Sequence, residues 1–75
     1  MEGIVKFLGV SSGTSSRGPY YNIEVHNNEG SLRLRCNEAV FNKGMRIEFG
    51  QDVTIHLRLR MYQGSVLVSV EDIEE

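Results

Sequence analysis

The segment from residue 52 to residue 62 alternates between apolar and polar side chains without a break. One row consists of Val53, Ile55, Leu57, Leu59 and Met61. The other row contains His56, Arg58, Arg60 and Tyr62. Successive side chains of a strand point to opposite sides of a sheet, so this pattern predicts a strand with one face in a core and the other in water. A chain with this segment is expected to fold around a β-sheet whose outer face is cationic and aromatic.

A shorter run repeats the pattern between residues 31 and 36, where Leu32, Leu34 and Cys36 alternate with Ser31, Arg33 and Arg35. The two Arg-X-Arg repeats together hold four of the eight basic residues. Arginine binds phosphate through two parallel hydrogen bonds and stacks on bases, so these rows favour nucleic acid as a polyanionic partner. In the alternative interpretation, the arginines cover the outer face of the sheet and pair with Glu24 or Glu48 across strands.

The size and composition indicate one small globular domain. The chain has 75 residues, of which 40% are hydrophobic and 24% charged. This length is near the lower limit for a stable core, so we expect a homodimer. The single cysteine, Cys36, excludes an internal disulfide and predicts a buried core thiol in a reducing compartment. No run is long enough to span a membrane and no signal peptide opens the chain, which predicts a cytoplasmic protein.

Charge is distributed unevenly along the chain. The net charge is −2, but four of the ten acidic residues lie within residues 71–75. Residues 1–70 therefore hold eight basic and six acidic residues, a balance of +2. Phosphate binding depends on the local potential of a face more than on total charge. We predict a barrel domain over residues 1–70 and an acidic tail over residues 71–75. The tail is either a solvated terminus, a competitor for the basic surface, or a site for a protein partner.

The order of the expected elements suggests a fold. Strands are expected at residues 3–10, 19–26, 31–36, 52–62 and 65–70, with a short helical turn within residues 37–44. The polar segment 11–18 is expected to form a mobile loop or hairpin tip. These elements predict an all-β, five-stranded antiparallel Greek-key barrel of the OB-fold type, with the helical turn between strands 3 and 4. An SH3-like barrel or an open sheet also fits the periodicity.

Sequence signatures of enzymes are missing. There is no Gly-rich phosphate loop and no paired histidine spacing for a metal. His26 and His56 fall on solvent-facing rows of different strands and are interpreted as ordinary surface residues. We therefore expect no catalysis, no metal and no cofactor.

Aromatic residues accompany the arginines on the outward rows. Tyr20 and Tyr62 are poorly placed for a core, and exposed tyrosines beside arginines suit single-strand binding. In that mode, bases stack on the rings while the cations follow the phosphate backbone. One of these tyrosines could instead pack at a dimer interface. Arg17, just before Tyr20, is expected to reach over a bound strand.

Residues 13–21, Gly-Thr-Ser-Ser-Arg-Gly-Pro-Tyr-Tyr, resemble the loop of small single-stranded-DNA-binding proteins from filamentous phages and related mobile elements. In that family, a polar loop carries a basic residue, a glycine and then an aromatic residue. The similarity continues more loosely through residues 34–36 and 64–68. The resemblance implies an OB-fold homodimer that coats single-stranded DNA with little sequence preference. By position, Arg17 and Tyr20 or Tyr21 would belong to the DNA-binding wing, and Arg33 or Arg35 to the groove floor.

The chain departs from this family at its end, where the family tends to be basic and residues 71–75 are acidic. Arg58 and Arg60 would then substitute for the family's final basic residues. A second resemblance, through residues 3–5, 27–30 and 50–57, is to the one-domain bacterial translation initiation factor and other S1-type RNA-binding OB domains. It implies the same fold but a different nucleic acid.

The sequence thus predicts non-catalytic binding of single-stranded DNA, through arginine–phosphate contacts and tyrosine–base stacking. The alternatives are an S1-type RNA-binding domain and a protein-interaction module such as a phage-encoded inhibitor. The candidate binding residues are Arg17, Tyr20, Tyr21, Arg33, Arg35, Arg58, Arg60 and Tyr62.

Overall fold

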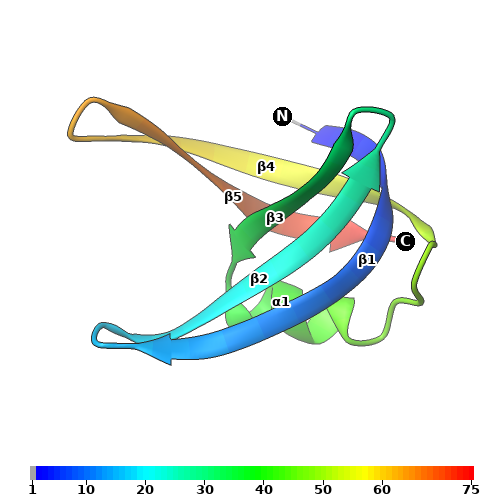
Figure 1. Ribbon diagram of the computed structural model, residues 1–75, viewed down its shortest axis with the longest axis horizontal. Coiled ribbons are helices and arrows are strands. Elements are labelled where there is room, and N and C mark those ends of the chain that lie inside the picture. The colour runs from blue at the N-terminus through cyan, green and yellow to red at the C-terminus, as the bar shows by residue number, and fades with distance from the viewer. Residues whose placement is uncertain (1) are drawn as a thin grey trace.

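Strands form most of the protein in the computed structural model, which describes residues 2–75 (Figure 1). The elements are β1 (Glu2–Ser15), β2 (Gly18–Asn27), β3 (Gly30–Cys36), α1 (Glu38–Gly44), β4 (Asp52–Tyr62) and β5 (Ser65–Glu74). The strands close into a barrel in the order β1-β2-β3-β5-β4, and β4 pairs back to β1. This order, with a helix between β3 and β4, is consistent with an OB-fold-like barrel. The prediction of a five-stranded β-barrel with a short helical turn between the third and fourth strands is confirmed.

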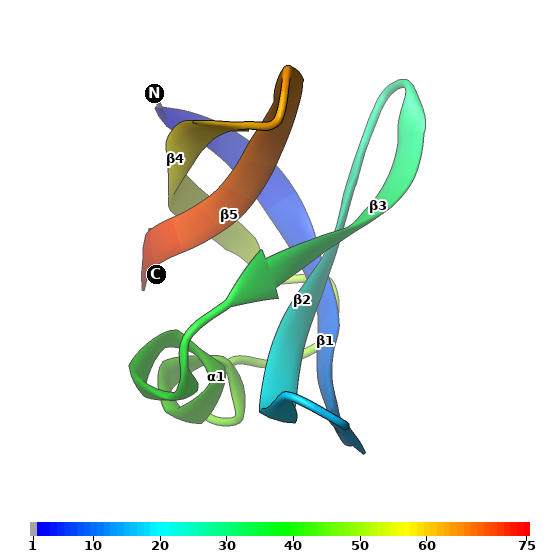
Figure 2. The same cartoon turned by 90° about the vertical axis from the view of Figure 1, so that its left-hand side faces the viewer.

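The barrel contains one parallel pair of strands, so the expectation of a purely antiparallel sheet is wrong at that pair. β3 and β5 run parallel and pair only at Arg35 with Ser69 and at Cys36 with Val70, whereas the other neighbours are antiparallel. The cause is the connection through α1. Because the helix and the following loop carry the chain across the barrel before β4 begins, β5 returns beside β3 in the same direction (Figure 2).

The apolar rows of the strands meet inside the barrel as their alternation predicts. The buried hydrophobic residues are Phe7, Ile23, Val25, Leu34, Val40, Ile47, Val53, Ile55, Val70 and Ile73. The apolar row of β4 is only partly inside, because Leu59 and Met61 are exposed where β4 and β5 extend beyond the barrel as a hairpin. The core therefore occupies the barrel proper, and this projecting hairpin lies outside it (Figure 1).

The short helix closes one end of the barrel. Asn37 caps it, since its side chain accepts a hydrogen bond of 2.9 Å from the backbone N–H of Val40. Lys43 donates to Asp72 at 2.6 Å and so ties α1 to β5. This hydrogen bond, followed by one from the Ile73 backbone, lowers the pKa of Asp72. Within residues 2–75, no helix has the length and apolar character that a membrane crossing requires.

The polar segment at residues 11–18 is a paired hairpin with its turn at residues 16–17, so the hairpin tip, rather than the mobile loop, of the two expected forms is observed. β1 continues to Ser15, and β2 begins at Gly18 directly opposite it. Gly13 lies opposite Tyr20, and a Cβ at residue 13 would overlap the tyrosine ring. The absence of a side chain at Gly13 lets the Tyr20 ring lie across β1. Residues 11–15 therefore form a strand, although their composition is typical of loops.

The expected boundary between a barrel and an acidic tail does not coincide with a structural boundary. β5 continues to Glu74, and the side chain of Ile73 is only 3% exposed. The pairing with β4 shifts register around Glu71, because His56 pairs with Asp72 whereas Leu57 pairs with Val70. A bulge of this kind turns both Val70 and Ile73 toward the core. Residues 71–74 therefore belong to the barrel.

Gly44, the last residue of α1, packs closely against Val10 of β1. A Cβ at this position would lie 2.6 Å from Cγ1 of Val10, a stiff β-branched side chain. We expect Gly44→Ala to lower the free energy of unfolding by about 1–2 kcal/mol in chemical denaturation, although alanine favours helices. Gly3→Ala is the matched control, because nothing lies within 4 Å of the added Cβ. Equal stability of the two variants would contradict the predicted overlap.

Candidate nucleic-acid interface

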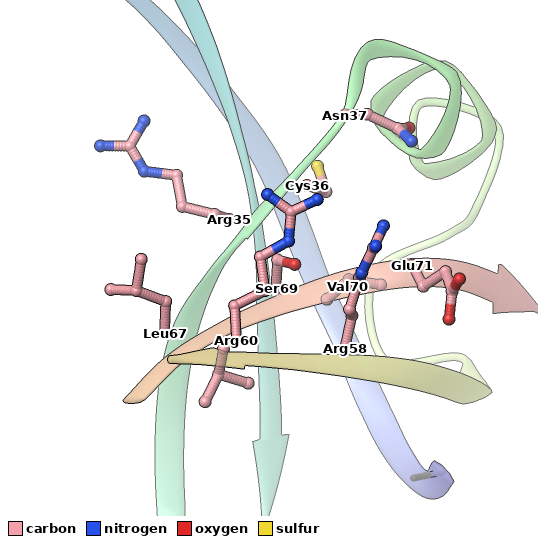
Figure 3. Close-up of a pocket in the computed structure, with 10 residues that line it drawn as sticks. Arg35, Cys36, Asn37, Arg58, Arg60, Leu67, Ser69, Val70 and Glu71 are labelled. Atoms are coloured by element: carbon pink, nitrogen blue, oxygen red, sulfur yellow. The ribbon is translucent and has the colours of Figure 1, made fainter. Parts of the chain in front are cut away.

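A cleft of about 610 Å³ lies where β5 meets β3, and arginines from two strands line it (Figure 3). Arg35 comes from β3, whereas Arg58 and Arg60 come from β4. Arg58 lies opposite Ser69 in the β4–β5 pairing, and Ser69 in turn pairs with Arg35. The parallel seam between β3 and β5 thus brings the two predicted arginine rows to one surface. We call the surface formed by Arg35, Arg58 and Arg60 the arginine cleft.

The cations of the arginine cleft are not neutralised by carboxylates. Within residues 2–75, none of the three guanidinium groups forms an ion pair, although three other lysine or arginine side chains do. Those pairs are Lys6–Asp52, Arg33–Glu24 and Lys43–Asp72. Glu71 is the acidic residue among those that line the cleft. Three arginines beside one carboxylate give this surface a local positive charge, although the whole chain carries a net charge of −2.

Arg33 lies outside the arginine cleft. It sits opposite Glu24 in the β2–β3 pairing, and its guanidinium lies 3.1 Å from the Glu24 carboxylate. The alternative interpretation of cross-strand pairing therefore describes Arg33. It does not describe Arg35, although the two residues occupy equivalent places in the Arg-X-Arg repeat.

Tyr20 and Arg35 form a stacked pair beside the cleft. The guanidinium carbon of Arg35 lies 4.5 Å from the centroid of the Tyr20 ring, within the range of a cation–π contact. Gly13 supports the ring from the neighbouring strand. The pair presents flat aromatic and guanidinium groups to one surface, and both types of group stack on nucleobases.

Tyr21 points toward the helix and lies outside the arginine cleft. Its hydroxyl donates to Glu38 at 2.8 Å, and its ring centroid lies 5.1 Å from that of Phe41. The hydrogen bond to the Glu38 carboxylate raises the pKa of Tyr21. Tyr21 therefore fastens α1 to β2, and its contacts do not support the sequence-based assignment to a binding wing.

The remaining two candidates occupy the tips of separate hairpins. Arg17 lies in the turn between β1 and β2, and Tyr62 ends β4 with 58% of its surface exposed. Figure 1 shows both hairpins projecting from the same side of the barrel, one on either side of the end of β3. Neither residue belongs to the lining of the arginine cleft.

The cleft also includes residues that the periodicity did not single out. Asn37 and Ser69 add polar groups to its wall. The position of Asn37 before a helical segment is a capping signal in the sequence. Its place in the cleft wall could not be predicted, because it depends on the pairing of β3 with β5. Cys36 also lines the cleft and is half-buried, and burial raises its pKa to about 11. The thiol is therefore protonated at neutral pH and is a poor nucleophile.

Comparisons with protein-family models, with curated proteins and with solved structures found no match to this chain. The resemblances to the phage DNA-binding proteins and to the S1-type domains stay predictions.

Proposed function

We propose that this protein binds single-stranded nucleic acid at the arginine cleft, with DNA preferred and without catalysis. The supporting observation is that three arginines from β3 and β4 line one cleft and lack ion-pair partners within residues 2–75. Unpaired guanidinium groups on a β-barrel surface are suited to phosphate, which arginine binds through a planar pair of hydrogen bonds.

The neighbouring aromatic groups supply the second part of the interaction. A base stacks on the Tyr20–Arg35 pair while the phosphates on either side contact the cleft arginines. Tyr62, at the tip of the β4–β5 hairpin, extends the stacking surface beyond the cleft, whereas Arg17, at the tip of the β1–β2 hairpin, lies outside the lining of the cleft. Phosphate contacts and ring stacking read no base edges, so little sequence preference is expected. The preference for DNA rests on the resemblance of residues 13–21 to the phage proteins.

The test is fluorescence anisotropy of a labelled oligo-dT, with oligo-U and duplex DNA as competitors, across a salt series. Three arginine–phosphate contacts predict a slope of about −2 for log K against log[salt], from about −0.7 per contact. Affinity should then fall roughly twentyfold between about 50 and 200 mM salt. Preference for oligo-U would assign the cleft to RNA. Absence of binding at low salt would remove the proposed function.

A further inference from the structure

The part of the β4–β5 hairpin beyond the barrel has one apolar, exposed face. Leu59 lies opposite Val68, and Met61 lies opposite Val66. Directly opposed residues share a face, so these four side chains form one patch, which we call the hairpin patch. Their exposed fractions are 50%, 38%, 72% and 57%, in the order named. A contiguous group of large apolar side chains at this exposure indicates a surface that another molecule covers.

The outer edge of β5 beside this patch has no neighbouring strand within the described residues. β5 meets β3 only at Ser69 and Val70, so residues 65–68 are unpaired on that side, and Figure 2 shows the two strands diverging there. Gln63 and Gly64, with φ of 49° and 80°, form a two-residue turn. In such a hairpin the residues flanking the turn are hydrogen-bonded to each other, so the backbone groups of Val66 and Val68 point away from β4.

The residues along this edge are typical of a strand that pairs with another strand. Exposed edges are commonly protected by a charged side chain or a proline, and the segment Ser-Val-Leu-Val at residues 65–68 has neither. A two-stranded ribbon is also marginally stable alone, whereas three or more strands with an apolar face are stable. The free edge and the hairpin patch therefore require the same partner, an extended strand that brings its own apolar side chains.

We propose that this partner is a second copy of the chain, paired β5 to β5 in the antiparallel direction about a two-fold axis. The edge is self-complementary, because the uncharged residues 65–68 place no like charges opposite one another. The edge of β3 is not, since pairing β3 with itself would bring Arg33 and Arg35 close to their own copies. The axis lies perpendicular to the ribbon, so the two hairpin patches fall on one side of a four-stranded ribbon.

This arrangement has a consequence for binding that rests on the proposed function. Arg58 and Arg60 lie on the face of the ribbon opposite to the hairpin patch. In the dimer, the arginines of both copies share that face and the two arginine clefts form one continuous basic surface. A strand long enough to cross the two-fold axis would then contact both copies, and it should bind more tightly than a strand confined to one cleft.

Analytical ultracentrifugation without nucleic acid tests the dimer across a concentration series into the high micromolar range. We expect a mass close to twice the 8.5 kDa of the chain. Val66→Lys should raise the dissociation constant of the dimer roughly tenfold or more, because it places a charge in the apolar interface. Ser65→Lys is the matched control, with the same charge on the adjacent residue but on the arginine face, and its dimer should persist.

A second variant separates the edge from the patch. Val66→Pro removes an N–H that points toward the partner while leaving the β4–β5 hydrogen bonds in place, and it should also yield monomers with an unchanged circular dichroism spectrum. A wild-type chain that stays monomeric, or equal dissociation constants for Val66→Lys and Ser65→Lys, would overturn the inference. If the protein is monomeric but binds oligo-dT, the proposed function stands and the dimer is excluded. If it is dimeric but binds no nucleic acid, the dimer stands and the proposed function is excluded.

Discussion

Removal of residues 71–75 is expected to unfold the barrel. The truncation deletes Ile73, which is buried in the core and pairs with Ile55 on β4. It also deletes Asp72, which accepts the hydrogen bond from Lys43 that ties α1 to β5. Truncating a buried isoleucine to alanine alone costs about 2–5 kcal/mol. A domain of this size has a total stability of roughly 4–11 kcal/mol at typical values per residue. Thermal denaturation monitored by circular dichroism should therefore show no cooperative transition.

The matched control keeps the strand and removes charge. In the double variant Glu71→Gln with Glu75→Gln, Ile73 and Asp72 are retained, so a melting transition close to that of the wild type is expected. Because Glu71 lines the arginine cleft, its neutralisation should strengthen binding to oligo-dT by roughly threefold at low salt. A cooperative transition in the truncated chain would show that residues 71–74 are dispensable for the barrel.

The truncation also identifies where the sequence pattern stops predicting the fold. β4 was predicted with its observed bounds because residues 52–62 alternate with a strict period of two. The end of β5 was not predicted, because the bulge at Glu71 separates the inward residues Val70 and Ile73 by three positions instead of two. Because four of residues 71–75 are also acidic, the end of the strand has the composition of a solvated tail.

The candidate site shows a similar division. Periodicity correctly placed Arg33 and Arg35 on the outer face of β3, but it could not distinguish them. Their difference comes from neighbouring strands, since Arg33 faces Glu24 on β2 whereas Arg35 stacks on Tyr20 and pairs in register with Ser69 on β5. The parallel seam that joins Arg35 to the arginines of β4 depends on the path of the chain through α1. No local pattern in the sequence carries that information.

The double variant Arg58→Ala with Arg60→Ala is expected to lose about thirtyfold in affinity for oligo-dT at low salt. Both residues line the arginine cleft, are exposed and lack ion-pair partners within residues 2–75. Removing two phosphate contacts, at about 1 kcal/mol each for solvent-exposed ion pairs, corresponds to this loss. The salt slope should flatten from about −2 to about −0.7, because one contact remains. Anisotropy across the salt series measures both quantities.

Two further variants decide whether the cleft itself or total charge is responsible. Arg33→Ala with Arg46→Ala removes the same charge from positions outside the cleft, and it should preserve the slope and keep affinity within roughly threefold. Arg58→Lys with Arg60→Lys should preserve the slope but lose several-fold in affinity, since lysine does not form the bidentate contact. An equal loss in the Arg58/Arg60 and Arg33/Arg46 alanine pairs would mean that binding follows net charge. The strand path would then have to lie elsewhere on the barrel.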